Sequence, residues 1–224
     1  MTDTFSASEL KRIKECRLFS GLSDGELQQS LKLLEASVAE YGRGTFIHRA
    51  DERLAFFGLV LSGSVQVYTD DINGDLMMMA NVTAGETFGE SLCYLNIERT
   101  QVFISTQEGA KVLRLRTDAF LGHNAESKRL EGLLYRNFVS MLAERTLSMN
   151  ERIQVLSKKT LREKLMTFFS QCEKKYHARS FTLPFDRAGL AIYLGSDRAA
   201  LSRELSAMRR DGIIDFSKNY FRIL

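Results

Sequence analysis

Apolar positions near the start of the chain recur at the spacing of amphipathic helices. Over residues 5–41 leucines stand at three- and four-residue intervals, as at Leu27 and Leu31, and this period predicts helical structure through the segment. Ser23 is followed three positions later by Glu26. Because this spacing is typical of a capping box, we expect a helix to begin directly after Ser23.

From Gly42 to about Thr117 the pattern changes to short runs in which apolar and polar residues alternate, as at Val65 and Val67. Glycines separate these runs, and many short strands divided by turn residues are typical of a small antiparallel barrel or roll. Asn73-Gly74 lies between two runs and predicts a hairpin turn. The predicted strands are "TFIH", "FGLVLSG", "SVQVYT", "LMMMANV", "QVFIST" and "KVLRLR".

Helical periodicity returns over residues 118–156 and continues for many turns. Two interpretations of its apolar stripe remain open: the helix packs on its own domain, or two copies pair as a dimeric coiled coil. The stripe is longer than one small barrel would cover, which favours the dimer. Its apolar members are Leu130, Leu134, Phe138, Met141, Leu142, Met149, Ile153 and Leu156.

The last segment, residues 157–224, alternates helices with short strands. "KKTLREKLMTFFSQCEKKY" predicts an amphipathic helix and "SFTLPF" a strand. Asp186 is placed to cap a second helix, Gly195 supplies a tight turn, and Ser196 or Asp197 caps a third. "GIIDFSKNYFRIL" predicts a closing hairpin that turns at residues 217–219.

The third helix of this segment is strongly two-sided. Leu201, Leu205 and Met208 recur at i, i+4 and i+7 and predict a buried face. Two helices joined by a glycine turn match the helix-turn-helix pattern, in which the second helix enters the major groove of DNA. Its other face carries the candidate DNA contacts Arg198, Ala199, Ser202 and Arg203, preceded by Ser196.

Each candidate contact suits this chemistry for a physical reason. An arginine fork pairs with guanine O6 and N7 in two hydrogen bonds, and small Ala199 and Ser202 let the helix approach the bases. Lys218, in the closing hairpin, is a candidate phosphate contact of a wing. The alternative is a surface helix with ordinary solvated arginines; the turn glycine, the caps and the wing together favour DNA.

The distribution of charge also points to a binding role for the C-terminal segment. The net charge is +3 overall, yet residues 157–224 hold 14 Lys and Arg against 7 Asp and Glu, a net of +7, which leaves −4 for residues 1–156. A basic segment behind an acidic body indicates a polyanionic partner for the C-terminal part.

Cysteine and histidine usage limits the other chemistries. Three cysteines stand far apart, which is typical of reduced thiols in the cytoplasm and gives no metal-ligand spacing, so we expect neither a metal site nor an iron–sulfur cluster. No apolar run spans a membrane and no signal peptide is visible, so we expect a cytoplasmic chain with no membrane partner. The cysteines are Cys16, Cys93 and Cys172, and the histidines are His48, His123 and His177.

At this point residues 10–224 resemble the CRP/FNR family of transcription regulators. "LGSDRAALSRELSAMRRDGII" is the most specific match, because it is similar to the family's DNA-binding signature. The resemblance implies an α+β chain with an N-terminal antiparallel β-roll like a cyclic-nucleotide-binding jelly roll, a long dimerisation helix and a C-terminal winged helix-turn-helix. The corresponding segments are 1–117, 118–156 and 157–224.

The same resemblance implies a homodimer that regulates transcription from a pseudo-palindromic site on double-stranded DNA, with RNA polymerase as a further partner if the protein activates. Ala199 departs from family members that carry a base-contacting glutamate at the matching position, so we expect a different operator sequence.

The segment "AGETFGESLCYLNIERTQVF" resembles the phosphate-binding cassette of cyclic-nucleotide sensors. The matching effector residues are Gly89, Glu90, Ser91, Arg99 and Thr100. In this resemblance the amides after Gly89 and the guanidinium of Arg99 bind a cyclic phosphate, while Glu90 accepts a hydrogen bond from the ribose. The bulky loop side chains and Gln101 depart from the pattern, which leaves another small effector, or an internal Glu90–Arg99 ion pair and no effector, as alternatives.

Other function classes fit less well. A cupin-like metalloenzyme needs clustered histidine and carboxylate ligands, and only His48 falls among the predicted strands. No nucleophile elbow or Walker loop is present, so we do not expect an enzyme. A haem ligated by His48 and a redox role for Cys93 have simpler alternatives as ordinary packed residues. A ligand-binding regulatory subunit that acts on another protein remains the alternative to a DNA-binding regulator.

Overall fold

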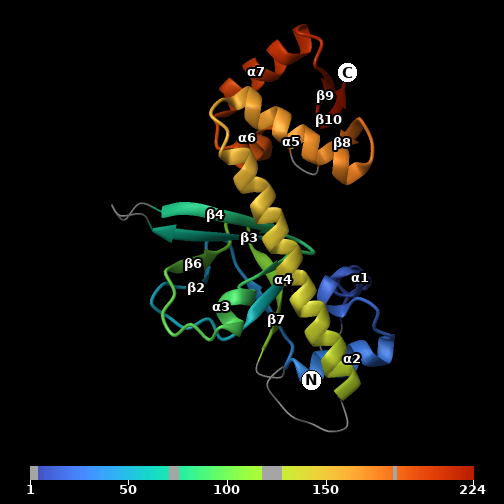
Figure 1. The fold of residues 1–224 in the computed structure, drawn as a ribbon. Coiled ribbons are helices and arrows are strands. Elements are labelled where there is room, and N and C mark those ends of the chain that lie inside the picture. The colour runs from blue at the N-terminus through green and yellow to red at the C-terminus, as the bar shows by residue number, and fades with distance from the viewer. Residues whose placement is uncertain (1–4, 71–75, 118–127, 184–185) are drawn as a thin grey trace. The chain divides into compact units, whose positions relative to one another are not determined.

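The computed structural model describes residues 5–70, 76–117, 128–183 and 186–224 (Figure 1). The expected Asn73-Gly74 turn lies outside the described residues, as does the start of the segment expected to form the long helix. The described chain divides into two compact units, residues 1–143 and 144–224, and the long helix contributes to both. Each unit has a core of its own.

In chain order the elements are α1 (Ala7–Glu15), η1 (Arg17–Phe19), α2 (Asp24–Leu33), β1 (Ser37–Tyr41), β2 (Phe46–His48), β3 (Phe57–Asp70), β4 (Leu76–Thr83), β5 (Thr87–Phe88), α3 (Glu90–Tyr94), β6 (Val102–Ser105), β7 (Ala110–Leu115), α4 (Lys128–Leu156), α5 (Leu161–Tyr176), β8 (Ser180–Thr182), α6 (Arg187–Leu194), α7 (Arg198–Arg210), β9 (Ile214–Ser217) and β10 (Tyr220–Ile223). The α+β class expected from the sequence is confirmed.

The N-terminal helices begin at side-chain caps. Ser23 accepts from the backbone N–H of Glu26, whose carboxylate accepts in return from the backbone N–H of Ser23, so the predicted capping box is confirmed. The prediction that residues 5–41 are helical throughout is wrong at its end, because residues 37–41 form strand β1. This segment pairs with β7, and that distant partner overrides the local helical spacing.

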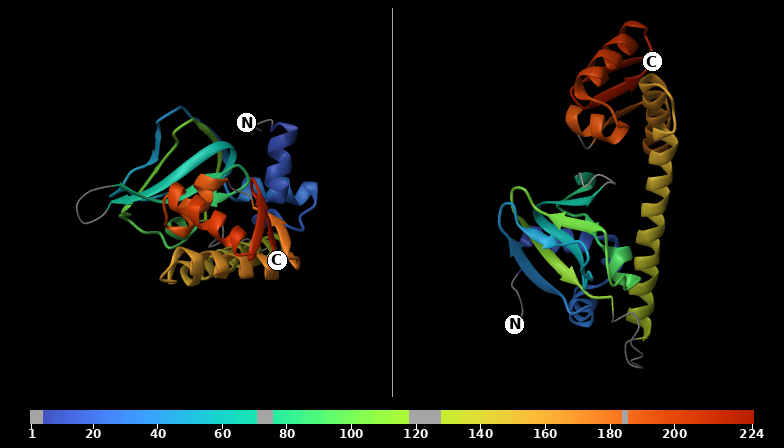
Figure 2. Two further views of the ribbon diagram at one scale, coloured as in Figure 1. Left: turned by 90° about the horizontal axis from the view of Figure 1, so that it is seen from above. Right: turned by 90° about the vertical axis from the view of Figure 1, so that its left-hand side faces the viewer.

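The predicted antiparallel roll is confirmed: the strands curl into a half-barrel in which every pairing is antiparallel (Figure 2). The main path runs β1-β7-β3-β6-β2, and β4 and β5 also pair with β3. The sequence predicted two separate strands that meet at Gly63, whereas β3 is one continuous strand of 14 residues. Gly63 lies in the left-handed region, at φ 75°, where a Cβ would stand 2.1 Å from the carbonyl oxygen of Gly109, so only glycine fits.

Two apolar clusters stabilise the first unit. One fills the roll itself around Val60 and Phe88, and the other joins the outer face of the roll to α1, α2 and the first half of α4. Phe138 of α4 is almost fully buried there, edge-on to Phe57 with ring centroids 5.7 Å apart. The first half of the predicted long helix therefore packs on its own domain.

The second unit is a small bundle of α5, α6 and α7 closed by the sheet β8-β10-β9. Its core combines Phe168, Phe169 and Leu165 of α5 with buried residues of the other two helices and of the sheet. The amphipathic helix, the strand and the closing hairpin expected over residues 157–224 are confirmed. Among the described residues no helix is long and apolar enough to cross a membrane.

Candidate nucleic-acid interface and effector site

The helix-turn-helix is built by two caps and one glycine. The carboxylate of Asp186 accepts from the backbone N–H of Gly189 at 2.9 Å and begins α6. Gly195 ends α6 in the left-handed conformation, at φ 60°. The next residue then donates its backbone N–H to the carbonyl of Ala191 at 3.0 Å, which turns the chain into α7.

Asp197, and not Ser196, is the cap of α7, which decides between the two predicted candidates. Its carboxylate accepts from the backbone N–H of Ala200 at 2.8 Å, and this hydrogen bond lowers the pKa of Asp197. The hydroxyl oxygen of Ser196 is buried and has no hydrogen-bond partner among the described residues. It therefore faces inward in this structure rather than toward the exposed face of α7.

The two faces of α7 lie as the sequence predicted. Leu201, Leu205 and Met208 have no exposed surface, so they fix the rotation of the helix on the core of its unit. The four candidate contacts of the opposite face are all exposed: Arg198, Ala199, Ser202 and Arg203. The hydroxyl of Ser202 donates to the carbonyl of Arg198 at 2.9 Å, which leaves its lone pairs facing outward as acceptors.

The one acidic residue of α7, Glu204, is neutralised from another helix. Arg162 at the start of α5 forms ion pairs with Glu204 and, at 2.7 Å, with Asp211 just beyond the end of α7. One guanidinium thus holds two carboxylates and ties α5 to α7. The exposed arginines Arg198 and Arg203 therefore lie on a helix whose own negative charge is compensated.

The predicted wing is the β9–β10 hairpin. Lys218 is exposed at its turn and adopts φ 52°, and Asn219 donates from its amide to the carbonyl of Leu183 at 3.0 Å. Three further residues hold this hairpin that sequence reasoning did not single out: Arg187, Arg209 and Phe216. Arg187 lies far from Phe216 in sequence, and the contacts of Arg209 with Asp215 and Phe216 cross from a helix to a strand, so no helical or strand period signals them.

In the predicted effector cassette, Gly89 adopts φ 80° and starts α3. A Cβ on Gly89 would stand 2.5 Å from the Leu54 side chain, so this turn requires glycine. Glu90 is buried, and its carboxylate accepts a hydrogen bond from the hydroxyl of Thr87. Thr87 and Glu90 thus form a partly buried hydrogen-bonded pair at the start of α3.

The remaining cassette residues separate into exposed and buried groups. Ser91 and Arg99 are exposed, and Arg99 forms no ion pair with any described residue, so the alternative of an internal Glu90–Arg99 pair is wrong. Thr100 is buried, with its hydroxyl 2.7 Å from Nε2 of His48. Burial lowers the pKa of His48, which favours its neutral form.

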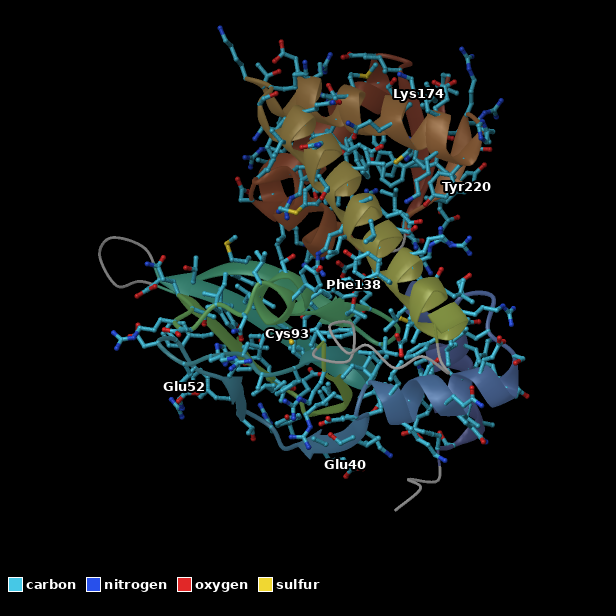
Figure 3. The ribbon with its side chains drawn as sticks, turned by 60° about the horizontal axis from the view of Figure 1, so that its bottom comes forward. Glu40, Glu52, Cys93, Phe138, Lys174 and Tyr220 are labelled. Carbon is cyan, nitrogen blue, oxygen red and sulfur yellow. The ribbon has the colours of Figure 1, made fainter. Side chains whose placement is uncertain are left out.

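The cassette helix contacts α4 through its last turn. The ring of Tyr94 lies 5.4 Å from that of Phe138, and the thiol of Cys93 lies 3.4 Å from the hydroxyl of Thr117; Figure 3 labels Cys93 and Phe138.

Cys16 and Cys172 are buried like Cys93, and burial raises the pKa of Cys16 and of Cys172 to about 11. In the described parts of the chain, no three His, Cys, Asp or Glu side chains gather as metal ligands.

The predicted apolar stripe of α4 divides in two: Leu130, Leu134, Phe138 and Met141 are buried against the first unit, whereas Met149 is 59% and Ile153 60% exposed. Counting in steps of four and three residues defines a second row of positions, the heptad stripe, which shares only its last members with the predicted one. Its positions are Tyr135, Val139, Leu142, Thr146, Met149, Ile153 and Leu156. This spacing is the a/d pattern of a coiled coil, continued for three heptads.

Comparison with known proteins finds a family match in each of the two parts of the chain. The family model for the cyclic nucleotide-binding domain matches residues 38–123, and the model for the Crp-like helix-turn-helix domain matches residues 161–224. The Cyclic AMP receptor protein of Thermus thermophilus is 24% identical over 202 residues, which are 90% of this chain and 89% of the relative. Electron transport regulator A of Shewanella oneidensis is 23% identical over 208 residues, 91% of this chain and 80% of the relative.

Solved structures show the same fold. The Catabolite Activator Protein of Thermus thermophilus superimposes with a TM-score of 0.53 at 22% identity and covers 93% of each chain. The c-di-GMP responsive global regulator CLP of Xanthomonas campestris gives a TM-score of 0.59 at 16% identity, covering 90% of this chain and 99% of that one.

A cyclic nucleotide-binding domain followed by a Crp-like helix-turn-helix defines the class of this protein as a modular transcription regulator. The chain belongs to the CRP/FNR family of transcription regulators, as the resemblance predicted. Its relatives are transcription regulators and not enzymes.

Proposed function

We propose that this chain is a cytoplasmic, effector-responsive regulator that binds a pseudo-palindromic DNA operator as a homodimer. One observation carries the proposal. Arg198 and Arg203 extend from a helix whose rotation is fixed by three fully buried side chains, so both cations are presented on the face that a major groove would receive.

The proposed roles differ along this interface. Arg198 and Arg203 read guanine edges through bidentate hydrogen bonds, while Ala199 and Ser202 allow close approach to the bases. Lys218 contacts the phosphate backbone from the wing and contributes affinity without sequence preference. Ser196, with its hydroxyl turned inward, acts at most through its backbone. The proposed division of labour is sensing by residues 1–117, dimerisation by 118–156 and DNA binding by 157–224.

The exposed heptad stripe supports the homodimer. Seven positions in a/d register on α4 suit a two-stranded coiled coil, and Met149 and Ile153 are each more than half exposed within one chain. Pairing two chains through α4 would bury these side chains. It would also hold two copies of α7 at a fixed separation, as a site with two half-sites requires.

The proposed regulation is a shift between two dimer arrangements. A small effector in the β-roll favours the arrangement for which it has higher affinity, and only that difference can alter DNA binding. Exposed Ser91 and Arg99 are the proposed anion contacts, while Glu90 and Thr100 are held internally by Thr87 and His48. This arrangement supports an anionic effector.

The test is selection of duplexes from a random pool by the purified full-length chain. We expect enrichment of a two-fold symmetric sequence with half-sites about one helical turn apart. The double substitution R198A/R203A should abolish the enrichment, whereas K174A, an exposed cation on α5 outside the proposed interface, should leave it unchanged. Recovery of random sequence, or equal loss in both variants, would overturn the proposal.

A further inference from the structure

The wing of the second unit is held by an aromatic ring between two arginines. The guanidinium carbon of Arg187, the first residue of α6, lies 4.6 Å from the ring centroid of Phe216 in β9, and that of Arg209 at the end of α7 also lies 4.6 Å from it. Arg187 further lies 4.9 Å from the ring of Phe221 in β10. Both helices of the helix-turn-helix thus contact the hairpin through one residue.

Hydrogen bonds fix one of these arginines on the hairpin. Arg209 donates to the carboxylate of Asp215 and, at 2.8 Å, to the carbonyl of Phe216. The Arg209 guanidinium lowers the pKa of Asp215. The charge of Arg209 is therefore paired with the carboxylate of Asp215 in the hairpin.

The tip of the hairpin is held from its other side. The backbone N–H of Leu183 donates to the carbonyl of Asn219 at 2.9 Å, and the side-chain amide of Asn219 donates to the carbonyl of Leu183 at 3.0 Å. Lys218 stands between this anchored residue and β9, with a left-handed backbone and an exposed side chain. Contacts at both ends of the turn restrict where the Lys218 ammonium can lie.

We propose that Arg187 and Arg209 are positioning residues that clamp Phe216, so that the wing presents Lys218 to the DNA backbone at a fixed place relative to α7. This inference rests on the proposed DNA-binding function. It gives Arg187 and Arg209 a positioning role in which neither side chain needs to contact a base or a phosphate. The clamp acts through Lys218, and this dependence is what distinguishes it from general stabilisation of the fold.

The test combines F216L, K218A and the double variant F216L/K218A in the full-length chain. The slope of log affinity against log salt is measured on a duplex selected by the wild type. Each single variant should lower the slope by about 1, the value of one phosphate contact, and the double variant also by about 1 rather than 2. R209K keeps the charge but loses the planar fork, so it should behave like F216L.

Tyr220 supplies the matched control, because it is a half-exposed aromatic residue of the same hairpin outside the clamp. Y220L should leave the slope at the wild-type value. A double variant whose losses add, or a K218A variant that binds like the wild type, would overturn the proposal.

A second measurement does not depend on DNA. Hydrogen exchange of the peptide spanning residues 213–224 should accelerate in F216L and R209K but not in Y220L, while exchange of α5 stays unchanged. Equal exchange in F216L and wild type would overturn the clamp even if DNA binding were intact. Failure of the wild type to select any duplex would instead overturn the proposed function, with the exchange result still deciding whether the clamp orders the hairpin.

Discussion

The hydroxyl oxygen of Tyr94 lies 3.3 Å from the hydroxyl oxygen of Tyr135, and this pair joins the cassette helix α3 to the long helix α4. The hydrogen bond to Tyr135 raises the pKa of Tyr94. Tyr135 is also the first position of the heptad stripe on α4. One side chain thus belongs both to the proposed dimer seam and to a direct contact with the proposed effector site.

Removing either hydroxyl should therefore have the same small effect. Y94F keeps the ring that packs near Phe138 and loses only the hydrogen bond, and because that bond is exposed we expect a small decrease in the free energy of unfolding. Y135F should cost the same, and Y94F/Y135F no more than either single change. Urea unfolding of all four proteins measures the cycle; additive losses would mean that the two hydroxyls do not act as a pair.

A charge in the exposed part of the stripe should separate the proposed dimer. I153E places a carboxylate at a seam position that is 60% exposed in one chain, so the isolated fold should tolerate it. Two such charges facing each other across a coiled coil would repel and lose apolar burial. Analytical ultracentrifugation should find that I153E is a monomer. Its circular dichroism spectrum should be the same as that of the wild type. S148E, exposed but off the a/d stripe, is the matched control and should remain dimeric.

Base readout and phosphate contact should be separable by substitution. R203A should lose about 1–3 kcal/mol of discrimination at one base position, because a bidentate contact with guanine is removed. K218A should weaken binding to all sequences alike and reduce the salt slope. Competition between the selected duplex and single-base variants measures the difference. If R203A weakened every duplex equally, direct readout by Arg203 would be wrong.

Much of this interface could be predicted because its signals are local. The spacing of Leu201, Leu205 and Met208, the glycine turn and the capping carboxylates all act within a few residues, and the structure places each as expected. Whether Ser196 or Asp197 caps α7 could not be decided from sequence, since both are good cap residues. The answer depends on which oxygen reaches the N–H of Ala200.

The main miss has a different cause, which is contact between distant segments. Residues 37–41 fit a helical period, but their pairing with β7 some 70 positions later makes them a strand, from Ser37 opposite Arg114 to Tyr41 opposite Ala110. The burial of Glu90 was missed for another reason. Motif resemblance locates the cassette but does not give the hydrogen-bond partner of its carboxylate, which is Thr87.

An acid-sensitive contact docks α1 on the roll. Lys111 lies 2.8 Å from the carboxylate of Glu9, and its hydrogen bond is the largest cause that lowers the pKa of Glu9 from 4.5 to about 2. A carboxyl with a depressed folded-state pKa stabilises the fold above its unfolded pKa. That stabilisation is lost as the pH falls from about 4.5 through about 2.

K111M should therefore make the free energy of unfolding depend less on pH in the acid range. We expect it to lower the free energy of unfolding at neutral pH, where Glu9 is ionised, and to change it little once Glu9 is protonated. Urea unfolding of the first unit across the acid range measures this. E40Q removes the second, well exposed carboxylate partner of Lys111 and should change the profile little. If the free energy of unfolding of K111M fell as steeply with decreasing pH as that of the wild type, the pH dependence would arise from other groups.

Loss of the arginine that neutralises α7 should weaken binding to every DNA sequence. R162L leaves the carboxylates of Glu204 and Asp211 uncompensated on the helix proposed to enter the groove. Their repulsion of phosphates should weaken binding severalfold, and the loss should shrink as salt is raised. R162L/E204Q removes one of the two charges and should recover part of the affinity. A loss in R162L that salt does not change, and that E204Q does not relieve, would mean that Arg162 acts only by tying α5 to α7.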